Sequence, residues 1–229
     1  MIKVNHSNFQ LTYKSLSLSV FVILCLALFH NNLIAQSKNS LNKSFDSLLK
    51  KEKLTGVVWS IVSENGEIEV GATGYKNNKT KELLSPNDKV HVGSVSKTVL
   101  AAGMLRLVTL GLIQLDDPVK KYLPELKFDN VWEIDQSITI RHLLDHTAGL
   151  ADVKLWFVFS TSATPNTPLN YVFCKSPDIL HIHTKPGKIY SYSNVGYTIL
   201  GMIIEKISNK RYEVFLNEEL LRPLGMDNS

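Results

Sequence analysis

The sequence reads Gly93-Ser94-Val95-Ser96-Lys97-Thr98 at the start of a predicted helix over residues 94–112. Apolar residues recur through this segment at helical spacing and give it a continuous apolar stripe. Ser94 and Lys97 are three residues apart, so a helix places their side chains on one face, one turn apart. A serine hydroxyl is a weak nucleophile at neutral pH and needs a base beside it. Lysine acts as that base where burial or nearby positive charge lowers its pKa.

The predicted position of Ser94 at a helix N-terminus favours the same chemistry. Backbone N–H groups are free there to bind an oxyanion, and the helix dipole favours negative charge. The spacing also fits a plain alternative, which is an ordinary helix cap followed by a solvated lysine.

A second polar segment reads Tyr190-Ser191-Tyr192-Ser193-Asn194, between Pro186-Gly187 and Gly196-Tyr197. A cation close to Tyr192 would favour its phenolate, so this side chain can carry a proton between a serine and a leaving group. Asn194 can hydrogen-bond a substrate amide and help to hold Lys97. The alternative is a turn stabilised by aromatic packing.

Together these segments resemble the serine β-lactamase and penicillin-binding-protein family, specifically its class C branch. The resemblance covers about residues 41–229. Besides the two segments above, it is carried by several ordered stretches at compatible spacings: Leu110–Val119, Lys121–Pro124, Ile138–Leu150 and Pro223–Met226.

The resemblance implies both a fold and a set of roles. The fold is β-lactamase/transpeptidase-like, of the α/β (α+β) class, with an antiparallel sheet subdomain and a helical subdomain. Ser94 is then the acylated nucleophile, with its backbone N–H as one oxyanion donor, and Lys97 is its proton acceptor. Tyr192 is the second acid/base group, and Asn194 orients the substrate. No cofactor or metal is implied.

The implied function is that of an exported serine hydrolase that forms an acyl-enzyme on an amide or ester carbonyl. A β-lactam, a D-alanyl peptide and a short ester all present such a carbonyl, so a small-molecule or peptide substrate is expected. The alternative belongs to another class, a catalytically silent or truncated homologue that acts as a peptidoglycan-binding or interaction module.

The resembled family has a third motif, a Lys- or His-initiated triad with a glycine on an edge strand. No segment after Asn194 matches it. We therefore expect residues 36–229 to be a serine hydrolase domain that lacks its C-terminal part and has an incomplete sheet. An antiparallel core limited to one hairpin is marginally stable.

The first 35 residues are typical of a targeting segment. Lys3 and Lys14 form a basic region, and residues 16–29 form a mostly apolar run before Ala35. A cleaved signal peptide fits residues 1–35, and so does an N-terminal anchor, because the charge-free stretch 15–37 is just long enough to span a bilayer. Both interpretations predict export, to the periplasm, the outside or the outer face of a membrane.

Composition excludes several other classes. Without Lys3 and Lys14, the remaining 23 basic and 21 acidic residues nearly balance, so nucleic acid is not an expected partner. A phosphate-binding loop would need glycine in place of His91 and Ser96. A zincin helix would need glutamate in place of Leu143, between His142 and His146.

The remaining histidines, the cysteine and one apolar patch allow two interpretations each. His181 and His183 have metal-like spacing without a third ligand close by, which also fits surface or packing histidines. Cys174 stands beside apolar residues and is expected to be buried, although a lone exported cysteine can also be a nucleophile or form an intermolecular bridge. Residues 155–159 form an apolar patch that fits a wall of the substrate pocket or a membrane-touching lid, and equally a packed helix over the rim of the active site.

The other expected elements follow from periodicity and turn signals. We predict a helix over residues 40–53, a hairpin of strands 57–62 and 67–72 around Asn65-Gly66, and a loop over 76–81. Further along we predict helices over 140–145, 197–207 and 212–221, and a surface loop over 160–168.

Overall fold

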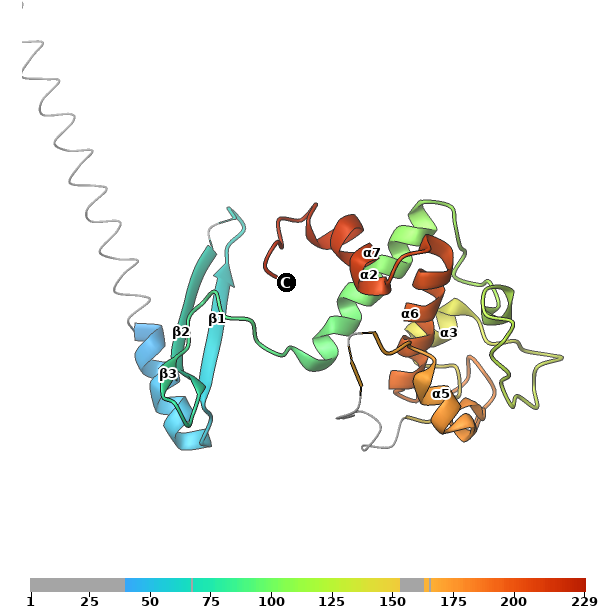
Figure 1. Ribbon diagram of the computed structural model, residues 1–229, viewed down its shortest axis with the longest axis horizontal. Helices are drawn as coiled ribbons and strands as arrows, with labels where there is room; N and C mark the ends of the chain where they lie inside the picture. The colour runs from blue at the N-terminus through green and yellow to red at the C-terminus, as the bar shows by residue number, and fades with distance from the viewer. Residues whose placement is uncertain (1–39, 67, 153–162, 165) are drawn as a thin grey trace, which may run out of the picture. The chain divides into compact units, whose positions relative to one another are not determined.

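The computed structural model describes residues 40–66, 68–152, 163–164 and 166–229. The predicted targeting segment 1–35, the stretch 15–37 and the apolar patch 155–159 lie outside these residues, as does part of the predicted loop 160–168. The chain divides into two compact units, Met1–Val90 and His91–Ser229, and each is described by itself (Figure 1). No helix within the described ranges combines the length and apolar character needed to cross a membrane.

The first unit is a helix over residues 40–52 packed on a three-stranded antiparallel sheet, in the order β1-β2-β3. The strands are β1 (Gly56–Val62), β2 (Ile68–Asn77) and β3 (Glu82–Leu83). The predicted turn is present, because Gly66 has a φ of +76° and donates to Ser63 O over 3.0 Å. Residues 76–77 belong to β2 and not to the predicted loop, because β3 pairs with that end of the strand.

Trp59 joins the helix to the sheet. It pairs with Gly71 across β1 and β2, and a side chain at Gly71 would overlap the indole ring. The indole N–H donates to Asn42 Oδ1 over 3.0 Å, and the ring stacks at 6.1 Å from Phe45. Because Gly71 has no side chain, there is space for the indole ring that links the helix to the sheet.

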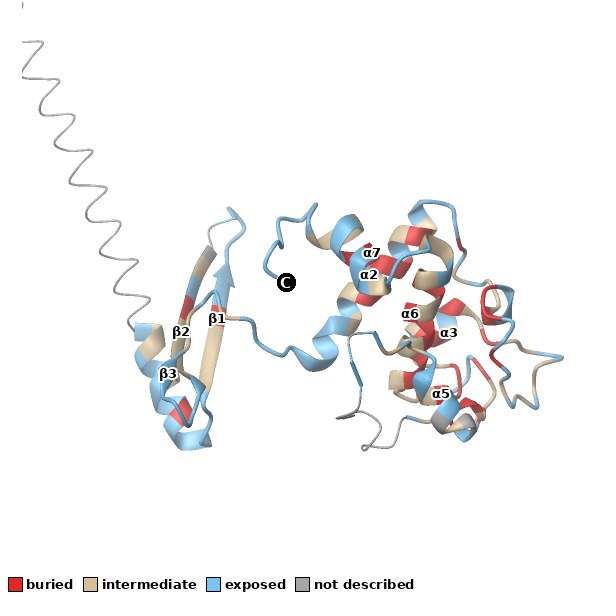
Figure 2. Ribbon diagram, in the orientation of Figure 1, coloured by how far each residue is buried: buried red, intermediate tan, exposed pale blue. Residues whose placement is uncertain are grey.

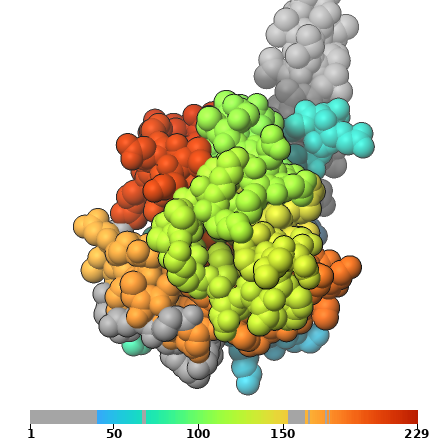
Figure 3. Space-filling model, turned by 90° about the vertical axis from the view of Figure 1, so that its right-hand side faces the viewer, coloured from blue at the N-terminus to red at the C-terminus, as the bar shows by residue number. Residues whose placement is uncertain are grey.

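The second unit is built around helices. Its elements, in chain order, are η1 (Gly93–Val95), α2 (Ser96–Thr109), η2 (Val119–Lys121), α3 (Ile140–Leu144), α5 (Tyr171–Lys175), η3 (Pro177–Leu180), α6 (Asn194–Ser208), α7 (Tyr212–Leu216) and η4 (Asn217–Leu221). The segment between α2 and α3 spreads over one face of this unit (Figure 3). The predicted helix 212–221 is present as α7 followed by the π-helical turn η4.

Helix α6 forms the centre of the core and packs against α2, α3 and α7 (Figure 2). Its buried apolar side chains include Ile199, Leu200, Ile203 and Ile204, and α2 and α3 contribute the buried Met104, Leu107, Ile140 and Leu143. Burying apolar surface stabilises a fold by about 25 cal/mol per Å², so this packing stabilises the unit.

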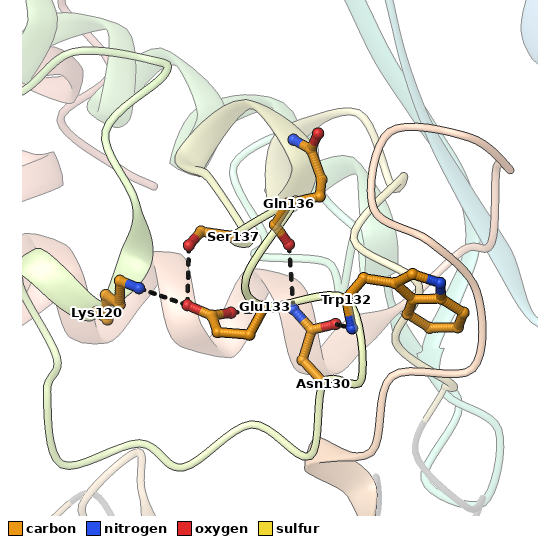
Figure 4. Close-up of polar contacts among 6 residues, drawn as sticks. All are labelled: Lys120, Asn130, Trp132, Glu133, Gln136 and Ser137. Carbon is orange, nitrogen blue, oxygen red and sulfur yellow. Dashed lines mark hydrogen bonds and ion pairs between the residues drawn. The ribbon is translucent and has the colours of Figure 1, made fainter.

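A polar network closes the loop between η2 and α3 (Figure 4). The carboxylate of Glu133 accepts from Lys120 Nζ at 2.6 Å, from Ser137 Oγ at 2.8 Å and from Asn130 Nδ2 at 3.0 Å. Asn130 Oδ1 also accepts from the Trp132 backbone N–H at 3.0 Å. The network fixes the chain just before Ile138 and α3, whose apolar side chains are buried in the core.

The helices of the second unit and the small antiparallel sheet of the first agree with the α/β (α+β) class expected from the sequence. The incomplete sheet was expected from the sequence. The division of the chain into a targeting segment 1–35 and a domain 36–229 stays a prediction.

Candidate active site

Ser94 lies in a 3₁₀ turn, η1, that leads directly into α2, and not in the first turn of the α-helix itself. Gly93 allows this geometry, since its φ of +56° is in the left-handed region that glycine enters without strain. The turn continues into α2, so Lys97, three residues later, lies on the same face as Ser94. Ser94 is exposed and accessible to a substrate.

All four residues that the sequence selected come together in the second unit. Lys97 Nζ lies 3.3 Å from Ser94 Oγ and 2.6 Å from Asn194 Oδ1. The Tyr192 hydroxyl lies 2.8 Å from Ser94 Oγ. A hydroxyl, an amine and a phenol from two distant segments therefore meet within hydrogen-bonding distance, which is the geometry that acyl transfer by a serine requires.

The start of α6 positions Tyr192 and Asn194. Ser193 is the N-cap of this helix, and its hydroxyl accepts from the Gly196 N–H at 3.3 Å and donates to Ala151 O at 3.0 Å. An N-cap serine satisfies a backbone donor that would otherwise lack a partner. The capping bond fixes the chain direction on both sides of Ser193, so that its two neighbours face Lys97.

The pKa of Tyr192 is lowered from its ordinary value. The hydrogen bond from Lys97 is the largest cause, and the contact with Ser94 adds to it, against a smaller opposing effect of burial. The ammonium group also lies 5.0 Å from the centre of the Tyr192 ring. The site therefore favours the phenolate, the form that accepts a proton.

His146 packs against the aromatic side of the site. Its Nδ1 accepts from the Ser193 backbone N–H at 3.2 Å, so this nitrogen carries no proton. The imidazole packs at 4.5 Å from the Tyr192 ring and 5.0 Å from the Tyr197 ring. Burial and, secondly, the charge of Lys97 lower the pKa of His146, which keeps the ring neutral.

Asp152 is a member of the site that the sequence did not single out. Its carboxylate accepts from the backbone N–H of Asn194 at 2.8 Å and from the side-chain amide. The two residues are 42 positions apart, so no local pattern could have paired them. The signal that was available is an acidic residue shortly after Gly149-Leu150, with no basic neighbour at helical spacing.

The other histidines make ordinary structural contacts. His142 belongs to a capping box with Thr139 at the start of α3, and His181 Nδ1 lies 2.6 Å from Asp129 Oδ2. Within the described part of the chain, no group of three or more His, Cys, Asp or Glu side chains is arranged to hold a metal ion.

The expectation that Cys174 is buried was wrong. Cys174 is exposed on α5, because the neighbouring Phe173 takes the position that faces the core.

Comparison with known proteins shows which proteins this chain is similar to. A family profile described as Beta-lactamase matches residues 41–229. Penicillin-binding protein 4* of Bacillus subtilis is 31% identical over 195 residues, which are 84% of this chain and 41% of that protein. The chain thus spans about two fifths of the length of the curated relatives it matches.

Solved structures with similar folds include a penicillin-binding protein homologue and an amidase. The octameric penicillin-binding protein homologue from Pyrococcus abyssi superposes with a TM-score of 0.71 at 28% identity, over 82% of this chain and 43% of that chain. The D-amino acid amidase from Ochrobactrum anthropi SV3 superposes with a TM-score of 0.58 at 26% identity, over 75% of this chain and 46% of that one. Both likenesses extend over three quarters or more of the chain.

Proposed function

This chain belongs to the Beta-lactamase family, and on that basis we propose that it is a serine hydrolase whose Ser94 is acylated by an amide or ester carbonyl. One observation carries the proposal. Ser94 Oγ is within hydrogen-bonding distance of both Lys97 Nζ, at 3.3 Å, and the Tyr192 hydroxyl, at 2.8 Å. The class C branch of the family is compatible with the Tyr192-Ser193-Asn194 segment and is part of the proposal.

The proposed reaction has two halves. As Ser94 Oγ bonds to the carbonyl carbon, its proton passes to the unprotonated amine of Lys97 and the carbonyl oxygen becomes an oxyanion. The oxyanion then collapses, the bond to the leaving group breaks, and Tyr192 supplies the proton that the leaving group takes up. Lys97 then returns its proton to the Tyr192 oxygen, which restores both groups. The product is an ester of Ser94, and water repeats the same steps on that ester to release the acid.

Two features of the site support these roles. Ser94 is the second residue of its 3₁₀ turn, where backbone N–H groups have no acceptor within the helix, so its own N–H is suited to an oxyanion. The hydrogen bond from Lys97 lowers the pKa of Tyr192, which supports its role in proton exchange.

The substrate class is an amide or an ester. Similarity to a penicillin-binding protein suggests β-lactams or D-alanyl peptides, and similarity to a D-amino acid amidase suggests a simpler amide. Activity toward nitrocefin, a D-Ala-D-Ala peptide, a D-amino acid amide and p-nitrophenyl butyrate would rank these candidates.

The decisive experiment is covalent labelling. The protein, expressed from its complete reading frame, is treated with a fluorescent fluorophosphonate and a fluorescent penicillin, beside Ser94→Ala and the matched control Ser96→Ala. We expect label on the wild type and on Ser96→Ala, located by mass spectrometry on Ser94, and none on Ser94→Ala. A wild type that takes up no label from either probe would favour the silent interaction module instead.

We also propose that residues 1–35 direct the protein out of the cytoplasm, as a signal peptide or as an anchor. The basic and then apolar order of the segment supports this. N-terminal sequencing of the protein from fractionated cells would distinguish the two forms: a new N-terminus near Gln36 indicates cleavage, and an intact one in the membrane fraction indicates an anchor.

A further inference from the structure

The Asp152 carboxylate accepts from both the backbone N–H and the side-chain amide of Asn194. Its Oδ1 lies 2.8 Å from the Asn194 backbone nitrogen and 3.0 Å from Asn194 Nδ2, and its Oδ2 lies 3.1 Å from the same Nδ2. The opposite end of the amide, Asn194 Oδ1, lies 2.6 Å from Lys97 Nζ. A continuous polar chain therefore leads from Asp152 through Asn194 to Lys97.

The chemistry of the two ends fixes the direction of the amide between them. An ionised carboxylate only accepts hydrogen bonds and an ammonium group only donates them, so the NH₂ of Asn194 must face Asp152 and its oxygen must face Lys97. Rotating the amide by half a turn would place donors against the donor Lys97 and an oxygen against the carboxylate. Both contacts would then be repulsive.

The backbone around Asp152 is tied to the same helix start. The Ser193 hydroxyl donates to Ala151 O at 3.0 Å, and the Ser191 hydroxyl donates to Leu150 O at 3.3 Å. The Asp152 carboxylate lies against the first residue of α6, where the positive end of the helix dipole also stabilises it. Asp152 is thus anchored next to Asn194, although its own side chain is exposed.

We propose that Asp152 is a positioning residue, which acts through the amide of Asn194 to hold Lys97 beside Ser94. This inference rests on the proposed function and goes beyond it, because it assigns a role to Asp152. Asn194 positions Lys97 through its oxygen, and the N–H of its amide that points away from Asp152 can still donate to a substrate.

The central test compares acylation kinetics of the full chain carrying Asp152→Asn with those carrying Asp116→Asn. The second variant is the matched control, because Asp116 pairs with Arg141 at 2.7 Å, away from the site. In Asp152→Asn an NH₂ group meets the NH₂ of Asn194 and favours the flipped amide. We expect kcat to fall about 10- to 100-fold, the effect of a misplaced catalytic group, with KM changed less than about twofold.

The pH profile gives a readout that a merely structural role would not move. Tyr192 is faced by Lys97, by the neutral ring of His146 and by the charge of Asp152, and the Asp152 charge raises the pKa of Tyr192. If Asp152→Asn displaces Lys97, Tyr192 loses the hydrogen bond that is the largest cause lowering its pKa, which outweighs the smaller effect of the lost Asp152 charge. The ionisation assigned to Tyr192 should therefore move to higher pH in Asp152→Asn and stay in place in Asp116→Asn. A normal kcat together with an unmoved profile in Asp152→Asn would overturn the inference.

The double variant Asp152→Asn/Asn194→Asp exchanges the two groups and conserves the charge. In this variant the carboxylate at position 194 faces Lys97, and the amide at position 152 faces that carboxylate. The double variant should therefore turn over faster than either single variant. A double variant as slow as the slower single one would contradict coupling through the amide.

A measurement independent of activity separates this inference from the proposed function. In ¹⁵N-labelled Ser94→Ala protein, the side-chain amide signals of Asn194 should lie apart from those of exposed asparagines. They should move to exposed-asparagine values when Asp152→Ala is added. Unchanged Asn194 signals would refute the positioning role even if the wild type proved inactive, and a shift in an inactive protein would retain it while removing the hydrolase proposal.

Discussion

The Tyr192 hydroxyl donates to Ser94 Oγ over 2.8 Å, although the two residues are 98 positions apart. The same ring lies 5.0 Å from Lys97 Nζ on one side and 4.5 Å from the His146 ring on another. Ser94 is therefore approached both by the amine of Lys97, on the following helix α2, and by a phenol from the segment just before α6, and the proposed chemistry depends on both contacts.

Replacing Tyr192 by phenylalanine should keep the aromatic packing and remove the hydroxyl. We expect acylation and deacylation to slow by about 10²- to 10⁴-fold, the usual contribution of a general acid or base. Tyr197→Phe is the matched control, because its hydroxyl donates to Leu144 O at 3.0 Å and not to Ser94. Burst and steady-state rates would measure both halves; wild-type rates in Tyr192→Phe would refute the role.

Lys97→Met should raise the pKa of Tyr192, since the hydrogen bond from Lys97 is the largest cause that lowers it. Ultraviolet difference absorbance of the tyrosinate follows this ionisation without any activity. The Tyr192 signal, identified by its loss in Tyr192→Phe, should appear at higher pH in Lys97→Met than in the wild type. An unmoved titration would show that the ammonium group does not act on the phenol. Turnover of Lys97→Met should be nearly abolished.

His146 should make the folded protein sensitive to acid. Its pKa is lowered on folding, from an ordinary value of 6.5, so the folded state binds a proton less readily than the unfolded chain. The stabilisation from neutral His146 is therefore complete above the unfolded pKa and is lost as pH falls below it.

The variant His146→Asn isolates this effect. Asparagine tolerates the φ of +59° at this position and offers an oxygen to the Ser193 N–H, but it does not titrate. Between about pH 7 and about pH 5, the urea midpoint of the wild type should fall more than that of His146→Asn. Parallel curves for the two proteins would contradict the prediction.

The core around α6 should carry much of the stability of the helical unit. Ile203 is fully buried there, whereas Ile134 is fully exposed. Ile203→Ala should cost about 2–5 kcal/mol of unfolding free energy through lost burial and a cavity. The same change at Ile134 should cost less than about 0.5 kcal/mol. Denaturant titration of the two variants is the measurement, and equal losses would disprove the assigned core.

Local signals in the sequence predicted most of the fold. Apolar periodicity identified α2, α3 and α6, and Asn65-Gly66 identified the hairpin turn. The start of α6 was placed at Tyr197, three residues late, because its N-terminal turn is specified by the Ser193 cap and not by apolar spacing. Strand β3 was not predicted, since two residues are too short for any period to show.

Motifs in the sequence predicted part of the candidate site. Ser94 and Lys97 are three residues apart in one motif, and the resemblance added Tyr192 and Asn194. Asp152 and the bracing contacts of His146 depend on tertiary contacts across about 40 residues or more. His146 accepts a hydrogen bond from the backbone N–H of Ser193, and because every residue but proline has such a group, the sequence carries no signal for this contact.

The two units differ in how much apolar surface they bury. Among the described residues of Met1–Val90, Leu49 and Trp59 are the buried apolar side chains, whereas α6 alone buries most of one face. Amide protons of β1 and β2 should therefore exchange with deuterium through frequent local openings, long before those of α6, which exchange only when the helical core opens.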